Sequence, residues 1–170
     1  MIDPRLITQL HALIEAEIGT QRTLLTIAEA RGREIIAGNI PAFTALETRE
    51  QQPQADAARL RQARERLLRA IAAAGNLKPE ELCVSRIANH APADRREPLI
   101  ARAAELRKIL ERLQQVHERN ALLMRHSLGL VREILHEIAG PTSPAAHPYD
   151  HRGGIGATTV TRGGLLNLRG

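Results

Sequence analysis

Aromatic side chains are nearly absent from this chain of 170 residues, which contains one Phe, one Tyr and no Trp. Its hydrophobic content is nevertheless 43%, supplied mainly by Ala, Leu and Ile. This composition favours extended helices and coiled coils over a compact α/β body. Without aromatic rings to stack on bases, we do not expect a site for single-stranded nucleic acid.

Disulfides, membrane spans and a signal peptide are not expected either. Cys83 is the only cysteine, so no internal disulfide can form. No apolar run approaches the roughly 20 residues of a membrane span. The N-terminal residues 1–13 lack the basic and apolar regions of a signal peptide. We therefore expect a cytoplasmic protein that does not insert into a membrane.

Motifs of catalysis and metal binding are also missing. The sequence has no glycine-rich phosphate loop, no Gly-x-Ser-x-Gly, no paired cysteines and no His-Glu-x-x-His. Glu133 and His136 have the spacing found in di-iron bundles, but no second Glu-x-x-His follows. His147 and His151 would bind a metal only weakly. We expect no enzymatic activity, no cofactor and no metal site.

The charge balance is basic, with a formal net charge of +5 and a pI of about 10.5. Nearly all the positive charge comes from Arg, but Asp and Glu are interspersed with it. That mixture favours a salt-bridged, solvated helix face over a nucleic-acid patch. The run at residues 59–69, RLRQARERLLR, is interpreted in the same way, with its aliphatic stems shielding the core.

Helical periodicity predicts an all-α fold, an elongated antiparallel helical bundle or coiled coil of three long helices and one short helix. Asp3-Pro4 and Gly38-Asn39 mark the start and the end of the first helix. Pro53 predicts a kink or a break in the second. The short helix is expected to be a small clip docked on the long ones. The expected helices cover residues of about 4–37, 40–74, 79–89 and 94–139, which form one domain over 1–139.

The last long helix carries an apolar stripe that spans roughly 160° of its circumference between residues 116 and 138. Packing on one neighbour needs only about 100°, so a second helix, another copy or a client must cover the surplus. Three polar residues lie along this part of the helix: His117, Asn120 and Ser127. Each of them requires a hydrogen-bond partner if its side chain is buried. The expected heptad seam consists of Leu99, Ala103, Leu106, Leu110, Leu113, His117, Asn120, Met124, Ser127, Val131, Ile134 and Ile138.

Residues 140–170 are rich in Gly and Pro and have no sustained period, which predicts a flexible, disordered C-terminal tail. Tyr149, the only tyrosine, stands within it in the stretch HPYDHRGG. The residues alone leave two interpretations open: an incidental exposed ring, or the anchor of a short recognition element.

Several stretches, in this order, resemble those of the FlgN-type flagellar type III export chaperones. The resemblance covers most of residues 6–152 and departs from the family pattern at Pro53 and in its basic charge. It is carried by Ile36-Ala-Gly-Asn-Ile40, Pro79-Glu-Glu-Leu82 leading to Ile87, Asn120-Ala-Leu-Leu-x-x-x-Ser127 followed by Leu130, Val131 and Ile134, and a tail that begins Tyr149-Asp150.

The resemblance implies a cytosolic, non-enzymatic chaperone that holds the hook-associated (hook-filament junction) proteins FlgK and FlgL by their helical C-terminal segments. It also implies delivery to the export gate protein FlhA, with Tyr149 as the residue that docks there. By position, it assigns client binding to Asn120, Leu123, Met124, Ser127, Leu130, Val131 and Ile134.

Without a client, we expect the stripe to fold against the first helix or to form a homodimer. The alternatives are a structural coiled-coil adaptor without a role in secretion and, less favoured, a basic helical nucleic-acid-binding protein.

Overall fold

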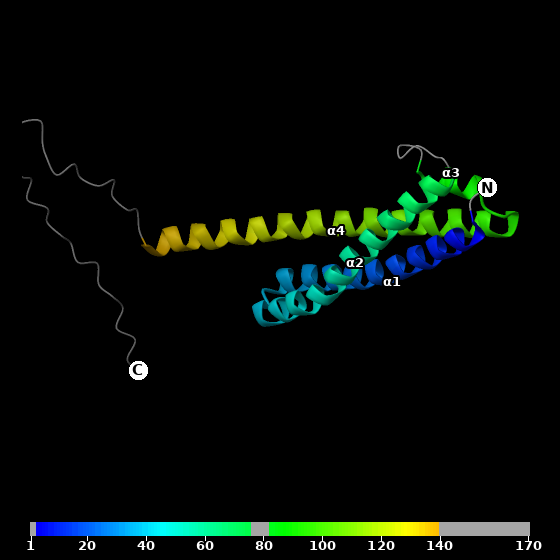
Figure 1. Cartoon of the computed structure of the whole chain (residues 1–170). Helices are drawn as coiled ribbons and strands as arrows, with labels where there is room; N and C mark the ends of the chain where they lie inside the picture. The colour runs from blue at the N-terminus through cyan, green and yellow to red at the C-terminus, as the bar shows by residue number, and fades with distance from the viewer. Residues whose placement is uncertain (1–2, 76–81, 140–170) are drawn as a thin grey trace, which may run out of the picture. The chain divides into compact units, whose positions relative to one another are not determined.

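The computed structural model describes residues 3–75 and 82–139, which form helices and no strand. This confirms the predicted all-α fold with three long helices and a short one. The helices are α1 (Pro4–Ala37), α2 (Ile40–Gly75), α3 (Val84–Asn89) and α4 (Ala93–Ala139) (Figure 1). The predicted tail, with Tyr149, lies outside the described residues. The chain divides into two units, residues 1–129 and 130–170, so α4 contributes to both.

Local capping signals fix the ends of α1. The Asp3 carboxylate accepts a hydrogen bond from the backbone N–H of Arg5 over 2.8 Å, and Pro4 occupies the first helical position. At the other end, Gly38 adopts a left-handed conformation with a φ of 66°. A residue with a side chain rarely adopts that conformation, so Gly38 turns the chain directly into α2.

A kink or a break was predicted at Pro53; the second helix is continuous through this residue, so the break does not occur. Proline lacks the backbone N–H that would bond to the carbonyl four residues earlier, and its ring crowds that turn. Neighbouring side chains contribute to packing on both sides of the proline, since Glu50 and Ala57 are buried. Packing against α1 therefore holds α2 together where local propensity alone opposes it.

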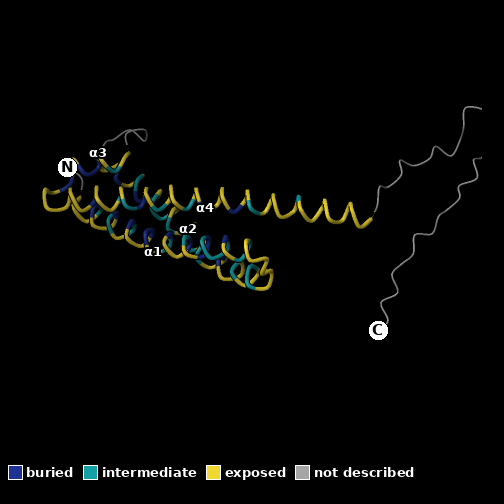
Figure 2. Tube along the Cα trace, turned by 180° about the vertical axis from the view of Figure 1, so that it is seen from behind, coloured by how far each residue is buried: buried dark blue, intermediate teal, exposed yellow. Residues whose placement is uncertain are grey.

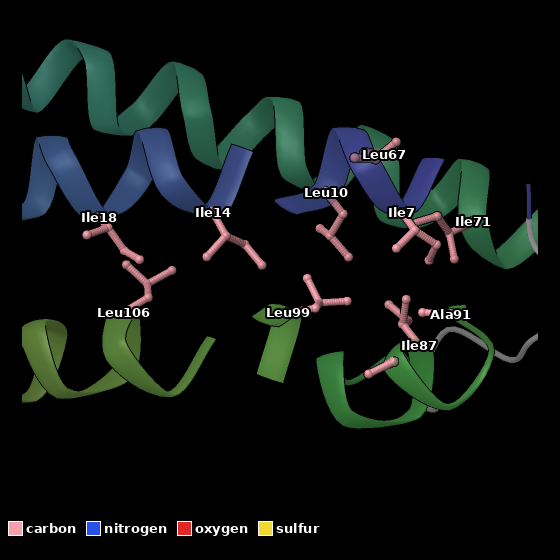
Figure 3. Packing of buried hydrophobic residues seen from close by; sticks show 11 residues of the cluster. Ile7, Leu10, Ile14, Ile18, Leu67, Ile71, Ile87, Ala91, Leu99 and Leu106 are labelled. Atoms are coloured by element: carbon pink, nitrogen blue, oxygen red, sulfur yellow. The ribbon is translucent and has the colours of Figure 1, made fainter. Parts of the chain in front are cut away.

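The main core lies where the first half of α1 meets the second half of α2, α3 and the start of α4 (Figure 3). All of its members are aliphatic, as expected from the scarcity of aromatic residues. The cluster comprises Ile7, Leu10, Ile14, Ile18, Leu67, Ile71, Ile87, Ala88, Ala91, Leu99 and Leu106.

Within residues 1–129, α1 runs antiparallel to α2 and parallel to α4 (Figure 1). Ion pairs join α1 and α4 in ascending order along both helices: Arg102 to Glu15 at 3.2 Å, Glu105 to Arg22, and Arg112 to Glu29 at 3.3 Å. All these charged groups are partly exposed. The ion pairs therefore contribute more to the register of α4 on α1 than to the stability of the fold.

A partly buried arginine cluster holds the turn end of the α1–α2 hairpin together. The Arg31 guanidinium lies 4.8 Å from the centre of the Phe43 ring and pairs with the carboxylates of Glu47 and Glu50. Gln54 donates a further hydrogen bond to Glu50 over 2.9 Å. The buried carboxylate of Glu50 is thus fully engaged by its neighbours.

The short helix α3 starts later than predicted. It begins at Val84 rather than near residue 79, because Leu82 and Cys83 are described and are not helical. Ile87 and Ala88 of α3 are fully buried, so the element docks on the long helices as the predicted clip.

The arginines of residues 59–69 fit the interpretation of a salt-bridged face. Three of the five arginines have a carboxylate partner: Asp56 for Arg59, Glu17 for Arg64 and Glu65 for Arg69. Across the described part of the chain, no helix combines the length and apolar character that a membrane span requires.

Candidate functional site

Of the seven residues assigned to client binding, those within residues 1–129 differ sharply in exposure. Asn120 is buried, with 8% of its surface exposed, and Leu123 is partly buried. Met124 is 40% exposed, and Ser127 is also exposed. The first part of the predicted site is therefore occupied by this chain's own packing, and the part that follows is open.

The assigned residues within 130–139 are all exposed: Leu130 by 59%, Val131 by 51% and Ile134 by 45%. Leu135 and Ile138 are exposed as well. These five residues follow a spacing of i, i+1, i+4, i+5 and i+8, which places them on one face of the helix. We call them the distal apolar face. Figure 2 shows this end of α4 as exposed throughout.

Asn120 is held by a contact with α1. Its side-chain nitrogen donates a hydrogen bond to the backbone carbonyl of Ala28 over 2.7 Å. Its side-chain oxygen is buried and has no hydrogen-bond partner among the described residues. The neighbouring residue on α1 is Gly32, where an added Cβ would lie 2.5 Å from that oxygen. The absence of a side chain at Gly32 is what lets the amide reach the α1 backbone.

The heptad seam on α4 is shifted from the one predicted. Val116 is buried and His117 is exposed, whereas the predicted seam contained His117. Likewise Leu110 is 41% exposed, and Ile109 packs against the core in its place. The stripe is wide enough for α1 to cover either edge, and α1 covers the edge that carries Ile109 and Val116. Of the three polar residues His117, Asn120 and Ser127, only Asn120 is buried.

Sequence reasoning missed the role of Gly32. A glycine in the interior of a helix costs about 1 kcal/mol relative to Ala, so its presence there is itself a signal of close approach. The Arg31 cluster was also missed, because its partners come from another helix.

The distal apolar face is suited to packing against another helix. Its members are aliphatic, and charged residues, among them Arg132, Glu133 and Glu137, occupy the other positions of the same turns. Such a face supplies affinity through buried apolar area, and flanking charges supply register.

A family model described as FlgN protein matches residues 1–155, which is most of the chain. No curated protein and no solved structure matches. FlgN proteins are export chaperones of the flagellar type III system and in general bind hook-associated proteins in the cytosol. The chain therefore belongs to the FlgN family of flagellar type III export chaperones.

Proposed function

We propose that this chaperone holds the hook-associated proteins FlgK and FlgL by their helical C-terminal segments, through the C-terminal part of α4. The observation that carries this proposal is the distal apolar face, whose assigned members Leu130, Val131 and Ile134 are each about half exposed. Exposed aliphatic residues gathered on one helix face are typical of a surface that awaits a partner. A client helix would lay its own apolar face on them.

The contacts of α4 indicate which of the assigned residues a client can reach without a rearrangement of α4 and α1. Met124, Ser127 and the distal apolar face are accessible as they stand. Asn120 and Leu123 are engaged or partly covered, so a client reaches them only if α4 parts from α1. Packing on α1 also fits the expectation that the client-free chain covers part of its own stripe.

The functions that we assign to the helical domain and to the tail rest on the FlgN resemblance alone. Residues 1–139 act as the domain that holds the client, and residues 140–170 act as the tail that presents Tyr149. Tyr149 in that tail docks the loaded chaperone on the export gate protein FlhA. A client-free homodimer through the distal apolar face is the alternative way to keep these side chains from water.

Calorimetry with the C-terminal helical segments of the organism's own FlgK and FlgL tests client binding. The wild type should bind at tens of micromolar or tighter, which corresponds to about −6 kcal/mol or better. The variant Leu130→Asp/Ile134→Asp should lose this binding, because a carboxylate would be buried against the client's apolar face. Both positions are exposed, so the variant should remain helical by circular dichroism.

The matched control is Ile36→Asp/Ile40→Asp at the α1–α2 turn, where both isoleucines are about 70% exposed. This control should bind as the wild type does. Failure of the wild type to bind, or equal losses in both double variants, would contradict the assignment of the client surface.

The variant Tyr149→Ala tests whether docking on the export gate is independent of client binding. The variant should keep its affinity for the client segments, and the loaded complex should lose binding to the cytosolic domain of FlhA in a pull-down. Retained FlhA binding would remove Tyr149 from the proposed mechanism.

A further inference from the structure

A groove of about 510 Å³ lies between α2 and α4 within residues 1–129. The buried side chains of Ile14 and Leu106 contribute to its lining, and the segment that contains Cys83 forms part of its wall. On the α4 side it is lined by Ile100 and Leu110, which remain 42% and 41% exposed. Two large aliphatic side chains thus line a groove that residues 3–75 and 82–139 leave open.

The α4 residues that line the groove have coiled-coil spacing. Ala103 and Leu110 are one heptad apart, and so are Ile100 and Arg107. The heptad pattern places Ala103 and Leu110 in the seam, but α1 packs on the adjacent edge of α4. Small residues such as Ala103 also let another backbone approach closely. This side of α4 therefore has the pattern of a helix-packing surface.

The charge of the groove is one-sided. Among the described residues, its lining contains two guanidinium groups, from Arg64 and Arg107, and no carboxylate. Arg64 already pairs with Glu17 at 3.3 Å. Among the described residues Arg107 forms no ion pair, and it stands at the flanking position where coiled coils pair a cation with a glutamate of the partner helix.

We propose that the groove between α2 and α4 docks a short amphipathic helix of a partner protein, with its aliphatic face on Ile100 and Leu110 and a glutamate opposite Arg107. The chain's own residues 140–170 are a poor occupant, because they carry Arg152, Arg162 and Arg169 but only one acidic residue, Asp150. The groove is separate from the client surface: Leu110 and Asn120, the first residue of that surface, lie about 15 Å apart along α4, at about 1.5 Å per residue. The chaperone would then hold a client and a second partner at once, which goes beyond client binding.

Cys83 provides a readout on the full-length protein. It is exposed, lines the groove and is the only cysteine, so its rate of alkylation by iodoacetamide reports whether the groove is covered. The probe is a synthetic helix of about three heptads with Leu at the seam positions and Glu at the flanking positions. A second peptide carries Lys in place of every Glu.

The Glu peptide at saturation should slow alkylation of Cys83 by about tenfold, whereas the Lys peptide should not. Arg107→Glu should reverse this preference, because like charges would then face each other in the Glu complex. Lys108→Glu is the matched control: it makes the same charge change on the next residue, outside the groove lining, and should behave as the wild type.

The client-surface variant Leu130→Asp/Ile134→Asp should also show full protection by the Glu peptide, which keeps this test independent of client binding. The proposal is overturned if the Glu peptide gives no protection, if both peptides protect equally, or if Arg107→Glu and Lys108→Glu behave alike. Circular dichroism of each variant shows that the fold persists.

Discussion

The side-chain amide of Asn120 donates its hydrogen bond to the carbonyl oxygen of Ala28, and this contact marks the last buried residue of α4. Before it, Leu99, Leu106 and Val116 are buried. After it, the side chains of α4 are partly or fully exposed. A buried polar residue in a helix seam typically fixes register, and this one fixes how far α4 packs within its own chain.

Gly32→Ala should destabilise the wild type by about 1 to 2 kcal/mol, because the new methyl group would crowd the buried Asn120 oxygen at 2.5 Å. In an Asn120→Ala background the same change should instead stabilise by up to about 1 kcal/mol through helix propensity. The remaining neighbour is the flexible end of Arg119, which can move aside. Urea unfolding of the four proteins gives the coupling energy. The same sign in both backgrounds would refute the close contact.

Arg31→Met should cost about 2 to 4 kcal/mol, because it leaves the buried Glu50 carboxylate without its guanidinium partner. Arg31→Lys keeps the charge, but lysine cannot reach Glu47 and Glu50 with two separate nitrogen atoms. The stability of this variant should therefore lie between those of the wild type and Arg31→Met. Thermal unfolding of the three proteins measures the order of their stabilities. Equal stability of the Met and Lys variants would show that charge does not matter at this site.

Glu17 should make stability fall as pH rises through the acidic range. Its burial raises its pKa above the ordinary value of 4.5, although the charges of Arg64 and Arg61 oppose the shift. Between the unfolded and folded pKa values the folded chain binds more protons, so this contribution is complete below the unfolded pKa and is lost above the folded one. Glu17→Gln, which does not titrate, should lack it.

Urea unfolding of the wild type and Glu17→Gln at pH 4 and pH 7 isolates this group, since the other carboxylates are common to both proteins. The stability of the wild type relative to the variant should be lower at pH 7 than at pH 4. Arg64→Met should widen that difference, because removing Arg64 raises the pKa of Glu17 further. An opposite trend would mean that the ion pair outweighs the burial.

Pro53→Ala should stabilise the protein by about 1 to 3 kcal/mol, because α2 is already continuous there and alanine restores the missing backbone donor. The measurement is the midpoint of chemical denaturation. Ala55→Pro, two residues further along the same helix, is the reverse control and should destabilise. A loss of stability in Pro53→Ala would show that the packing of α2 depends on the proline's geometry.

Local chemistry allowed much of the fold to be predicted. Asp3 and Pro4 start α1 and Gly38 ends it, each through its own backbone preference, and the aliphatic periodicity gives three long helices. The structure differs from the local prediction at the start of α3, where the hydrophobic period was too short to place the boundary, and at Pro53, where α2 is continuous and the break does not occur.

The amino-acid sequence was enough to predict that the chain is helical, that α4 has more apolar surface than one neighbour can cover, and that the chain resembles FlgN chaperones. It could not predict which edge of the α4 stripe packs on α1, which became known from the packing of the helices. Hydrophobic periodicity locates the buried face of a helix only to within a residue or two. It therefore could not tell whether His117 or Val116 is buried, and the packing of α1 buries Val116. Gly32 then allowed Asn120 to reach Ala28, and Leu110 was left facing an open groove. These outcomes depend on close contacts between residues far apart in the chain, and a local pattern carries no information about such contacts.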